Sequence, residues 1–168
     1  TALDATSKSG DSEAYLTNCS SLGVAYRRIN LPDSALYYYG KGLEAAMKSK
    51  DYSAVSNLHA NIAVMYISFK QLENAKEHAR EAITYALKEE DALDWLQAYY
   101  ICGSLLVKTG EYDQAINYLH KAYGIASRQQ SPRFRLKVLS ALLPAFQATA
   151  QDDSVRYYLN VCDRFLDE

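Results

Sequence analysis

Three histidines and three cysteines are the side chains of this sequence that could act as a general base, a nucleophile or a metal ligand. They are His59, His78, His120, Cys19, Cys102 and Cys162. None of them stands in an HExxH or CxxC spacing, and the sequence contains no glycine-rich phosphate loop or nucleophile elbow. The histidines fall on three different predicted helices, and the cysteines occupy small or apolar packing positions. We therefore predict no catalytic residue, no metal site and no cofactor.

A second set of side chains suits binding better than catalysis. Asn57 and Asn61 are four residues apart, so on a helix they share one face. Their amides can donate to and accept from the backbone of an extended peptide without reading its side chains. Tyr100 could add a flat contact with a polar end. These residues predict a surface that holds a protein segment.

The elements that position these residues follow from an internal repeat with a period of about 40 residues. Small residues recur at this spacing: Gly23, Ala63 and Gly103; Ala35, Ala75 and Ala115; Gly42, Ala82 and Ala122. Each period divides into two stretches with apolar residues at helical spacing. We predict an all-α fold of about eight antiparallel helices, each of about 16–18 residues, in four repeats. The predicted repeats of this single domain are 11–50, 51–90, 91–130 and 131–168, and residues 1–10 are interpreted as the tail of an earlier repeat in a larger protein.

Helix boundaries carry matching signals. The same register of each repeat holds a short side chain whose oxygen can cap the first helix: Asp11, Asp51, Asp91 and Ser131. Acidic residues suit the start of the second helix: Asp33, Glu73, Asp113 and Asp153. In the turns between the two helices, Asn30 and Gly110 tolerate a left-handed backbone, whereas Lys70 and Ala150 tolerate it less well. Pro132 suits a first helical position, and Pro144 should kink or shorten the seventh helix.

Composition excludes several other classes. The chain has 168 residues, 49% hydrophobic and 23% charged, which is typical of a folded domain. Seven glycines and three prolines are too few for the many turns of an all-β fold. Its formal net charge of −2 gives no global attraction to nucleic acid, and no apolar run approaches the ~20 residues of a membrane helix. We expect a soluble segment, cytoplasmic or periplasmic or linked to a membrane-bound regulator.

The repeat resembles the tetratricopeptide repeat family. The family's pattern is carried by Leu22, Gly23, Tyr26, Ala35, Tyr39 and Gly42, and again by residues 110–115 with Leu119 and Ala122. The period is longer than the family's usual period of about 34 residues, as in its longer-period members. The resemblance implies a right-handed α-α superhelix, a solenoid that binds proteins or peptides. In style the Tyr-rich second helices resemble the repeat regions of Bacteroidetes-type signalling regulators.

This resemblance implies a concave surface lined by the first helix of each repeat. On it the register places Arg27, Asn57, Asn61, Val64, Gln97, Tyr100, Ser104, Lys108 and Lys137. The family's clamp for a terminal carboxylate is expected to be absent, because only Asn61 matches its pattern. The alternative interpretation is that these residues form a solvated surface that binds nothing in this segment.

One stretch departs from the neutral charge balance. Residues 114–151 contain no acid and five cations: Lys121, Arg128, Arg133, Arg135 and Lys137. Arg133 and Lys137 share a helical face. Two interpretations remain open: a patch for an acidic protein segment, or an exposed face with helix-end cations, which is the one we favour.

The function that these observations favour is non-catalytic binding of a protein or peptide segment, as the sensory or scaffolding part of a bacterial regulator. The segment is expected neither to contact nucleic acid directly nor to insert into a membrane. The alternative is a structural module that self-associates through exposed repeat ends. An enzyme is the least favoured class.

Overall fold

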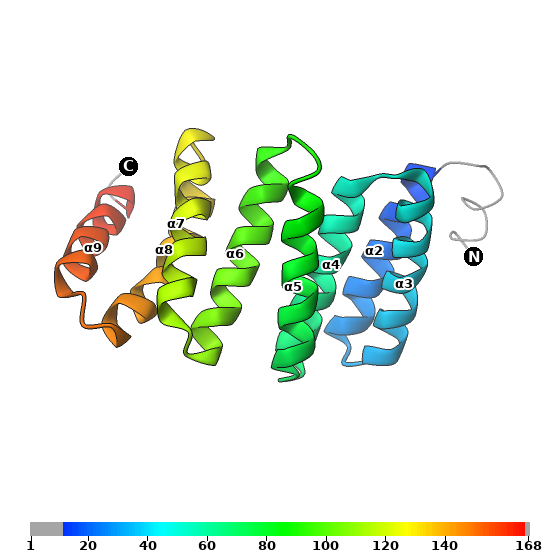
Figure 1. Ribbon diagram of the computed structural model, residues 1–168, viewed down its shortest axis with the longest axis horizontal. Coiled ribbons are helices and arrows are strands. Elements are labelled where there is room, and N and C mark those ends of the chain that lie inside the picture. The colour runs from blue at the N-terminus through cyan, green and yellow to red at the C-terminus, as the bar shows by residue number, and fades with distance from the viewer. Residues whose placement is uncertain (1–11, 167–168) are drawn as a thin grey trace. The chain divides into compact units, whose positions relative to one another are not determined.

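The computed structural model describes residues 12–166, and every regular element in this range is an α-helix (Figure 1). The helices are α2 (Ser12–Arg28), α3 (Pro32–Ser49), α4 (Tyr52–Ser68), α5 (Leu72–Ala86), α6 (Ala92–Thr109), α7 (Tyr112–Arg128), α8 (Pro132–Ala148) and α9 (Asp152–Leu166). The predictions of an all-α fold and of eight helices are confirmed. None of these helices combines the length and the apolar composition needed to cross a bilayer.

The chain divides into two compact units between Asp91 and Ala92. Unit 1 contains α2 to α5, and unit 2 contains α6 to α9. In each unit consecutive helices pack as pairs, α2 with α3 and α4 with α5, then α6 with α7 and α8 with α9. The first helices of the two pairs also touch, α2 against α4 in unit 1 and α6 against α8 in unit 2. The interpretation of the whole chain as one domain of four repeats stays a prediction.

Small residues mark the places where paired helices approach closely. All nine small residues that recur with the repeat spacing are buried. A Cβ on Gly23 would overlap the Tyr39 ring, and one on Gly103 would lie 2.6 Å from Cγ of Leu119. Close packing therefore requires the small side chain, as the repeat pattern predicted.

Every turn inside a repeat contains a residue with a left-handed backbone. The φ values are 63° for Asn30, 59° for Lys70, 80° for Gly110 and 53° for Ala150. Lys70 and Ala150 adopt this conformation although their side chains favour it little. Around Lys70 the cause is a pair of backbone hydrogen bonds: its N–H donates to Ile67 at 3.1 Å, and the next N–H donates to Tyr66 at 2.9 Å.

The predicted caps have mixed outcomes. The Asp51 carboxylate accepts a hydrogen bond from the backbone N–H of Ala54 at 2.9 Å, which confirms that cap. The prediction for Ser131 is wrong, because its side chain makes no capping bond; the fixed φ of Pro132 starts α8 there instead. Asp11 lies outside the described residues.

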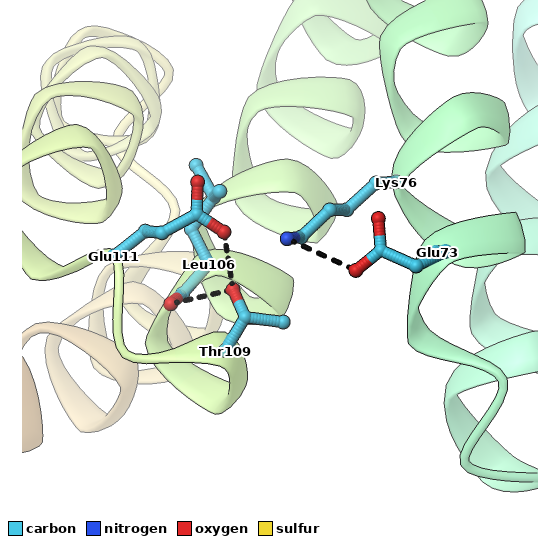
Figure 2. Close-up of polar contacts among 5 residues, drawn as sticks. All are labelled: Glu73, Lys76, Leu106, Thr109 and Glu111. Carbon is cyan, nitrogen blue, oxygen red and sulfur yellow. Dashed lines mark hydrogen bonds and ion pairs between the residues drawn. The ribbon is translucent and has the colours of Figure 1, made fainter.

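Acidic residues occupy the first turns of the second helices, as predicted for Asp33, Glu73 and Asp113. On α5 the carboxylate of Glu73 also pairs with Lys76 at 3.4 Å (Figure 2). At the end of α6, the Thr109 hydroxyl lies 3.2 Å from the Leu106 carbonyl and 2.9 Å from a carboxylate oxygen of Glu111 (Figure 2). These contacts fix the starts of second helices in their own units.

Pro144 does not shorten its helix, so that part of the prediction is wrong. Helix α8 runs for 17 residues and continues past Pro144 to Ala148. Proline removes the hydrogen bond to the carbonyl four residues earlier, here that of Ser140. Both Ser140 and Pro144 are exposed, so water can satisfy this carbonyl and the helix continues.

Candidate functional site

In unit 1 the candidate face is formed by α2 and α4. The side-chain amide of Asn61 donates a hydrogen bond to the Ser20 hydroxyl at 3.2 Å, which ties the two helices together. Asn57 lies one turn before Asn61, and both asparagines are half-buried. Helix α4 contains no charged residue over its 17 positions. The face therefore presents neutral hydrogen-bonding groups, and its binding of a protein segment stays a prediction.

The two other predicted residues of unit 1 are Val64 and Arg27. Val64, on the same helix as the asparagines, is half-buried. Arg27 is also half-buried, and its guanidinium lies close to the hydroxyl of Tyr39 on α3. Burial raises the pKa of Tyr39, and the positive charge of Arg27 opposes this rise. Arg27 is thus directed in part to the packing of α2 against α3.

In unit 2 the candidate face is formed by α6 and α8. The Lys137 ammonium lies 4.4 Å from the centre of the Tyr100 ring and 5.7 Å from that of Phe134, within the range of cation–π attraction. Partial burial lowers the pKa of Lys137, and the positive charge of Arg133 lowers it further. The structure thus brings together two predicted residues, Tyr100 and Lys137, from different helices.

The remaining predicted residues of unit 2 lie along α6. Gln97 and Ser104 are half-buried, whereas Lys108 is exposed near the end of the helix. The Ser104 hydroxyl oxygen is buried and has no hydrogen-bond partner among the described residues. A single groove that runs from Arg27 to Lys137 stays a prediction, since each face is described within its own unit.

A histidine pair joins α4 to α5 in unit 1. The Nδ1 atoms of His59 and His78 are 2.9 Å apart, a hydrogen-bond distance that requires one ring to donate and the other to accept. The His59 ring stacks on Tyr85 with centroids 5.8 Å apart, and His78 stacks on Tyr66 at 5.5 Å. Sequence reasoning placed these histidines on different helices and did not pair them.

Burial sets the protonation of this pair. It lowers the pKa of His59 to about 4, and the neighbouring His78 contributes to the shift. Burial also lowers the pKa of His78, while the carboxylates of Glu77 and Glu81 oppose that change. Both rings are therefore neutral at pH 7, which is the state that a hydrogen bond between them needs.

A family model for the tetratricopeptide repeat matches residues 56–89 and 96–129. The chain contains tetratricopeptide repeats. The two matched repeats start at the same register of the internal repeat, and they coincide with most of α4 and α5 and of α6 and α7. Repeats of this family mediate interactions between proteins. The assignments to a longer-period subfamily and to a Bacteroidetes-type regulator stay predictions.

Solved structures of other proteins share the tetratricopeptide-like fold. BtubC (BKLC) from P. vanneervenii matches 93% of the chain with a TM-score of 0.81 and 16% identity. Aspartyl phosphate phosphatase F from Bacillus subtilis matches 98% with a TM-score of 0.76 and 17% identity, and MamA matches 99% with a TM-score of 0.66 and 16% identity. The matches cover 65%, 44% and 88% of those chains, so this chain spans less than two thirds of the first two. At such low identity the likeness concerns the fold alone. No curated protein sequence matches the chain significantly.

Equivalent positions in the tetratricopeptide repeats explain the histidine pair. One repeat later, His59 and His78 correspond to Tyr99 and Tyr118, whose rings stack with centroids 6.0 Å apart. One repeat earlier, Tyr66 and His78 correspond to Tyr26 and Tyr38, whose rings also stack. The signal that could have revealed the pair is therefore the repeat itself, which places both histidines at facing positions.

The cysteines and His120 are the remaining side chains that could do chemistry. Cys19 and Cys102 are buried free thiols, and burial raises the pKa of Cys19. The Cys162 side chain lies outside the described part of the structure. Among the residues that are described, no three His, Cys, Asp or Glu side chains are grouped so that they could hold a metal ion. His120 contacts Tyr158, with its Nδ1 3.3 Å from the tyrosine hydroxyl.

Proposed function

We propose that the chain is a non-catalytic interaction module that binds an extended segment of another protein along the first helices of its repeats. The observation that carries this proposal is the α2/α4 face, where the Asn61 amide is held by Ser20 and Asn57 lies one turn away. Amides fixed on a helix can pair with the backbone of an extended segment at little cost in side-chain entropy. Direct contact with nucleic acid is not part of this function.

A set of random dodecapeptides displayed on phage tests this function. The chain should select peptides from the set, and the double variant Asn57→Ala with Asn61→Ala should lose most of that binding. Loss of the Ser20 contact should lower Tm by at most a few degrees, because one net hydrogen bond contributes about 1 kcal/mol. Circular dichroism should show an unchanged helix content.

A matched control uses two asparagines on second helices. Asn74 on α5 and Asn117 on α7 are exposed, so their double replacement by Ala removes the same groups from other surfaces. That variant should retain the selected peptides. Equal loss in both double variants, or selection of no peptide by the unchanged chain, would reject the binding face.

The proposal includes a regulatory setting in a bacterium. It is supported by the resemblance of the Tyr-rich second helices to repeat regions of bacterial regulators. Likeness in fold to aspartyl phosphate phosphatase F from Bacillus subtilis agrees with this setting. Identification of an output domain in the parent protein would test it.

A second candidate function is self-association through aromatic residues on second helices. Tyr37 on α3 and Tyr157 on α9 occupy equivalent positions and are 60% and 61% exposed, unlike most tyrosines of the chain. Exposed aromatic side chains of this kind favour protein contacts. Light scattering should then give a mass that rises with concentration, and Tyr37→Lys with Tyr157→Lys should restore the monomer mass. A constant monomer mass at high concentration would reject this candidate.

A further inference from the structure

Two of the three cations in the first half of α8 have a spacing that no other first helix shares. Arg133 and Lys137 are one turn apart, so their Cβ atoms are separated by about 6 Å. The equivalent residues are Ser53 and Asn57 on α4, and Leu93 and Gln97 on α6. This pair of cations is therefore a feature of α8 and not a consequence of the repeat.

Within the described part of the chain, the two cations have no acidic partner. Helix α8 contains no acidic residue, and the single acid of α6, Asp94, is buried. Neither Arg133 nor Lys137 forms an ion pair with any residue that the structure describes. Their mutual repulsion contributes to the lowered pKa of Lys137, so an added negative charge here would relieve an existing unfavourable interaction.

Two aromatic rings restrict the side chain of Lys137. Its ammonium lies over Tyr100 of α6 and Phe134 of α8, so the side chain is ordered before any partner arrives. Less side-chain entropy is then lost on binding than for a free surface lysine. No acidic residue stands in the first turn of α8, so the positive end of its dipole adds to the potential of the same region.

We propose that Arg133, Lys137 and Tyr100, here named the α8 cationic face, bind an extended protein segment that carries two acidic residues two positions apart. This inference rests on the proposed binding function and specifies its partner in unit 2. In an extended segment, side chains two positions apart point the same way and lie about 6.6–7 Å from each other. That distance matches the spacing of the two cations, whereas adjacent acidic residues would point to opposite sides.

Four fluorescent nonapeptides on a Gly/Ser background test this spacing by anisotropy. They contain Glu-Ser-Glu, Glu-Glu, Glu-Ser-Ser-Ser-Glu or Gln-Ser-Gln at the centre. The Glu-Ser-Glu peptide should bind the full chain about tenfold more tightly than the Gln-Ser-Gln peptide, as expected for two charge-assisted contacts at exposed positions. It should also bind more tightly than the two other acidic peptides, and about 0.5 M NaCl should remove most of the difference.

Variants assign the effect to the α8 cationic face. Arg133→Gln and Lys137→Gln should each remove the preference for Glu-Ser-Glu, and Lys137→Arg should retain it. The control is Lys121→Gln on α7, which removes an exposed cation that also lies over tyrosine rings. Circular dichroism of each variant checks the fold, which these exposed positions should not disturb.

Four outcomes would overturn the inference. The first is equal binding of all acidic peptides whatever their spacing, and the second is an equal effect of Lys121→Gln. The third is tighter binding of single-stranded DNA or of vesicles containing phosphatidylserine than of the Glu-Ser-Glu peptide. Selection of neutral peptides that depends on Asn57 and Asn61, without any acidic preference, would reject this inference while retaining the proposed function.

Discussion

The helix pairs α4/α5 and α6/α7 have the same register but different chemistry where their helices meet. In the first pair, His59 and His78 share a hydrogen bond of 2.9 Å. In the second, Tyr99 and Tyr118 occupy the equivalent positions and stack at 6.0 Å. The repeat thus fixes where two rings meet, and the residue types decide whether that contact responds to pH.

The two helix pairs differ in the sizes of the buried side chains that lie at equivalent positions. In α6/α7 a Cβ on Gly103 would lie 2.6 Å from Cγ of Leu119. The residues at the same register of α4/α5 are Ala63 and Ala79. All four residues are buried. A larger side chain on one helix is therefore matched by a smaller one on its partner, which keeps the space between them filled.

The largest expected effects come from converting the Gly103–Leu119 contact into the alanine pair. Leu119→Ala leaves a cavity and should lower the free energy of unfolding by about 2–5 kcal/mol. Gly103→Ala forces a Cβ to 2.6 Å from Cγ of Leu119 and should cost about 1–3 kcal/mol. The double variant should cost at least about 1 kcal/mol less than the sum, because the shorter side chain makes room for the new methyl group. Urea unfolding followed by the fluorescence of Trp95, which lies in unit 2, measures each variant.

Gly124→Ala is the matched control on α7. A Cβ at Gly124 would meet no atom within 4 Å, so the substitution should stabilise the helix by about 0.5–1 kcal/mol. Additive costs in the Gly103/Leu119 cycle would contradict the idea of matched volumes.

The histidine pair should make unit 1 sensitive to acid. His59 has its pKa lowered to about 4 in the folded state, below the ordinary value of 6.5, so the unfolded chain binds more protons between these values. Its contribution to stability is therefore complete above pH 6.5 and is lost as the pH falls toward 4. The loss in the free energy of unfolding should be roughly 1–2 kcal/mol. This is smaller than the value that the whole pKa shift would give, because the ring is partly exposed and water screens its charge. Thermal unfolding between pH 7 and pH 4.5 measures it.

The matched variant places the tyrosine pair of α6/α7 into α4/α5. His59→Tyr with His78→Tyr removes both titrating rings, while Glu77, Glu81 and other carboxylates remain in both proteins. As the pH falls, the Tm of the unchanged protein should therefore decrease more than the Tm of the double variant. Parallel pH profiles would show that the pair does not couple to folding.

The fold could be predicted from the sequence because the residues that recur with the repeat spacing are also the residues that become buried. Small residues at the repeat spacing predicted the close approaches, and all nine are buried. Turn chemistry was less readable, since Lys70 and Ala150 take a left-handed backbone that backbone hydrogen bonds stabilise and side-chain preference does not.

The candidate site was readable where one helix carries it. Asn57 and Asn61 could be placed on one face from their spacing alone. Contacts between helices were harder, because the bond from Asn61 to Ser20 and the placing of Lys137 over Tyr100 depend on how two helices pack. The histidine pair was not predicted for the same reason, because the partner of each ring depends on how α4 and α5 pack together.

A third difference lies in the core between the paired helices. In α4/α5 the buried Ser56 hydroxyl donates to the Ala82 carbonyl at 2.8 Å, whereas Leu96 holds the equivalent position in α6/α7. Ser56→Ala should lower the free energy of unfolding by about 1 kcal/mol, the net value of one buried hydrogen bond. Urea unfolding measured by circular dichroism checks this. Ser68→Ala, which removes an exposed bond within α4, is the control and should cost less.

The smallest expected effects concern the cations over the tyrosine rings of the two pairs. The Lys88 ammonium lies 4.2 Å from the centre of the Tyr85 ring and 4.8 Å from that of the Tyr52 ring. The Lys121 ammonium is farther from its rings, at 5.4 Å from the centre of Tyr99 and 5.6 Å from that of Tyr118. Because cation–π attraction weakens with distance, Lys88→Gln should cost about 0.5–1 kcal/mol and Lys121→Gln only a few tenths. Urea unfolding of each variant, with Lys→Arg at both positions to retain the charge, measures the two costs. An equal or larger cost for Lys121→Gln would mean that ring distance does not set the contribution of these cations.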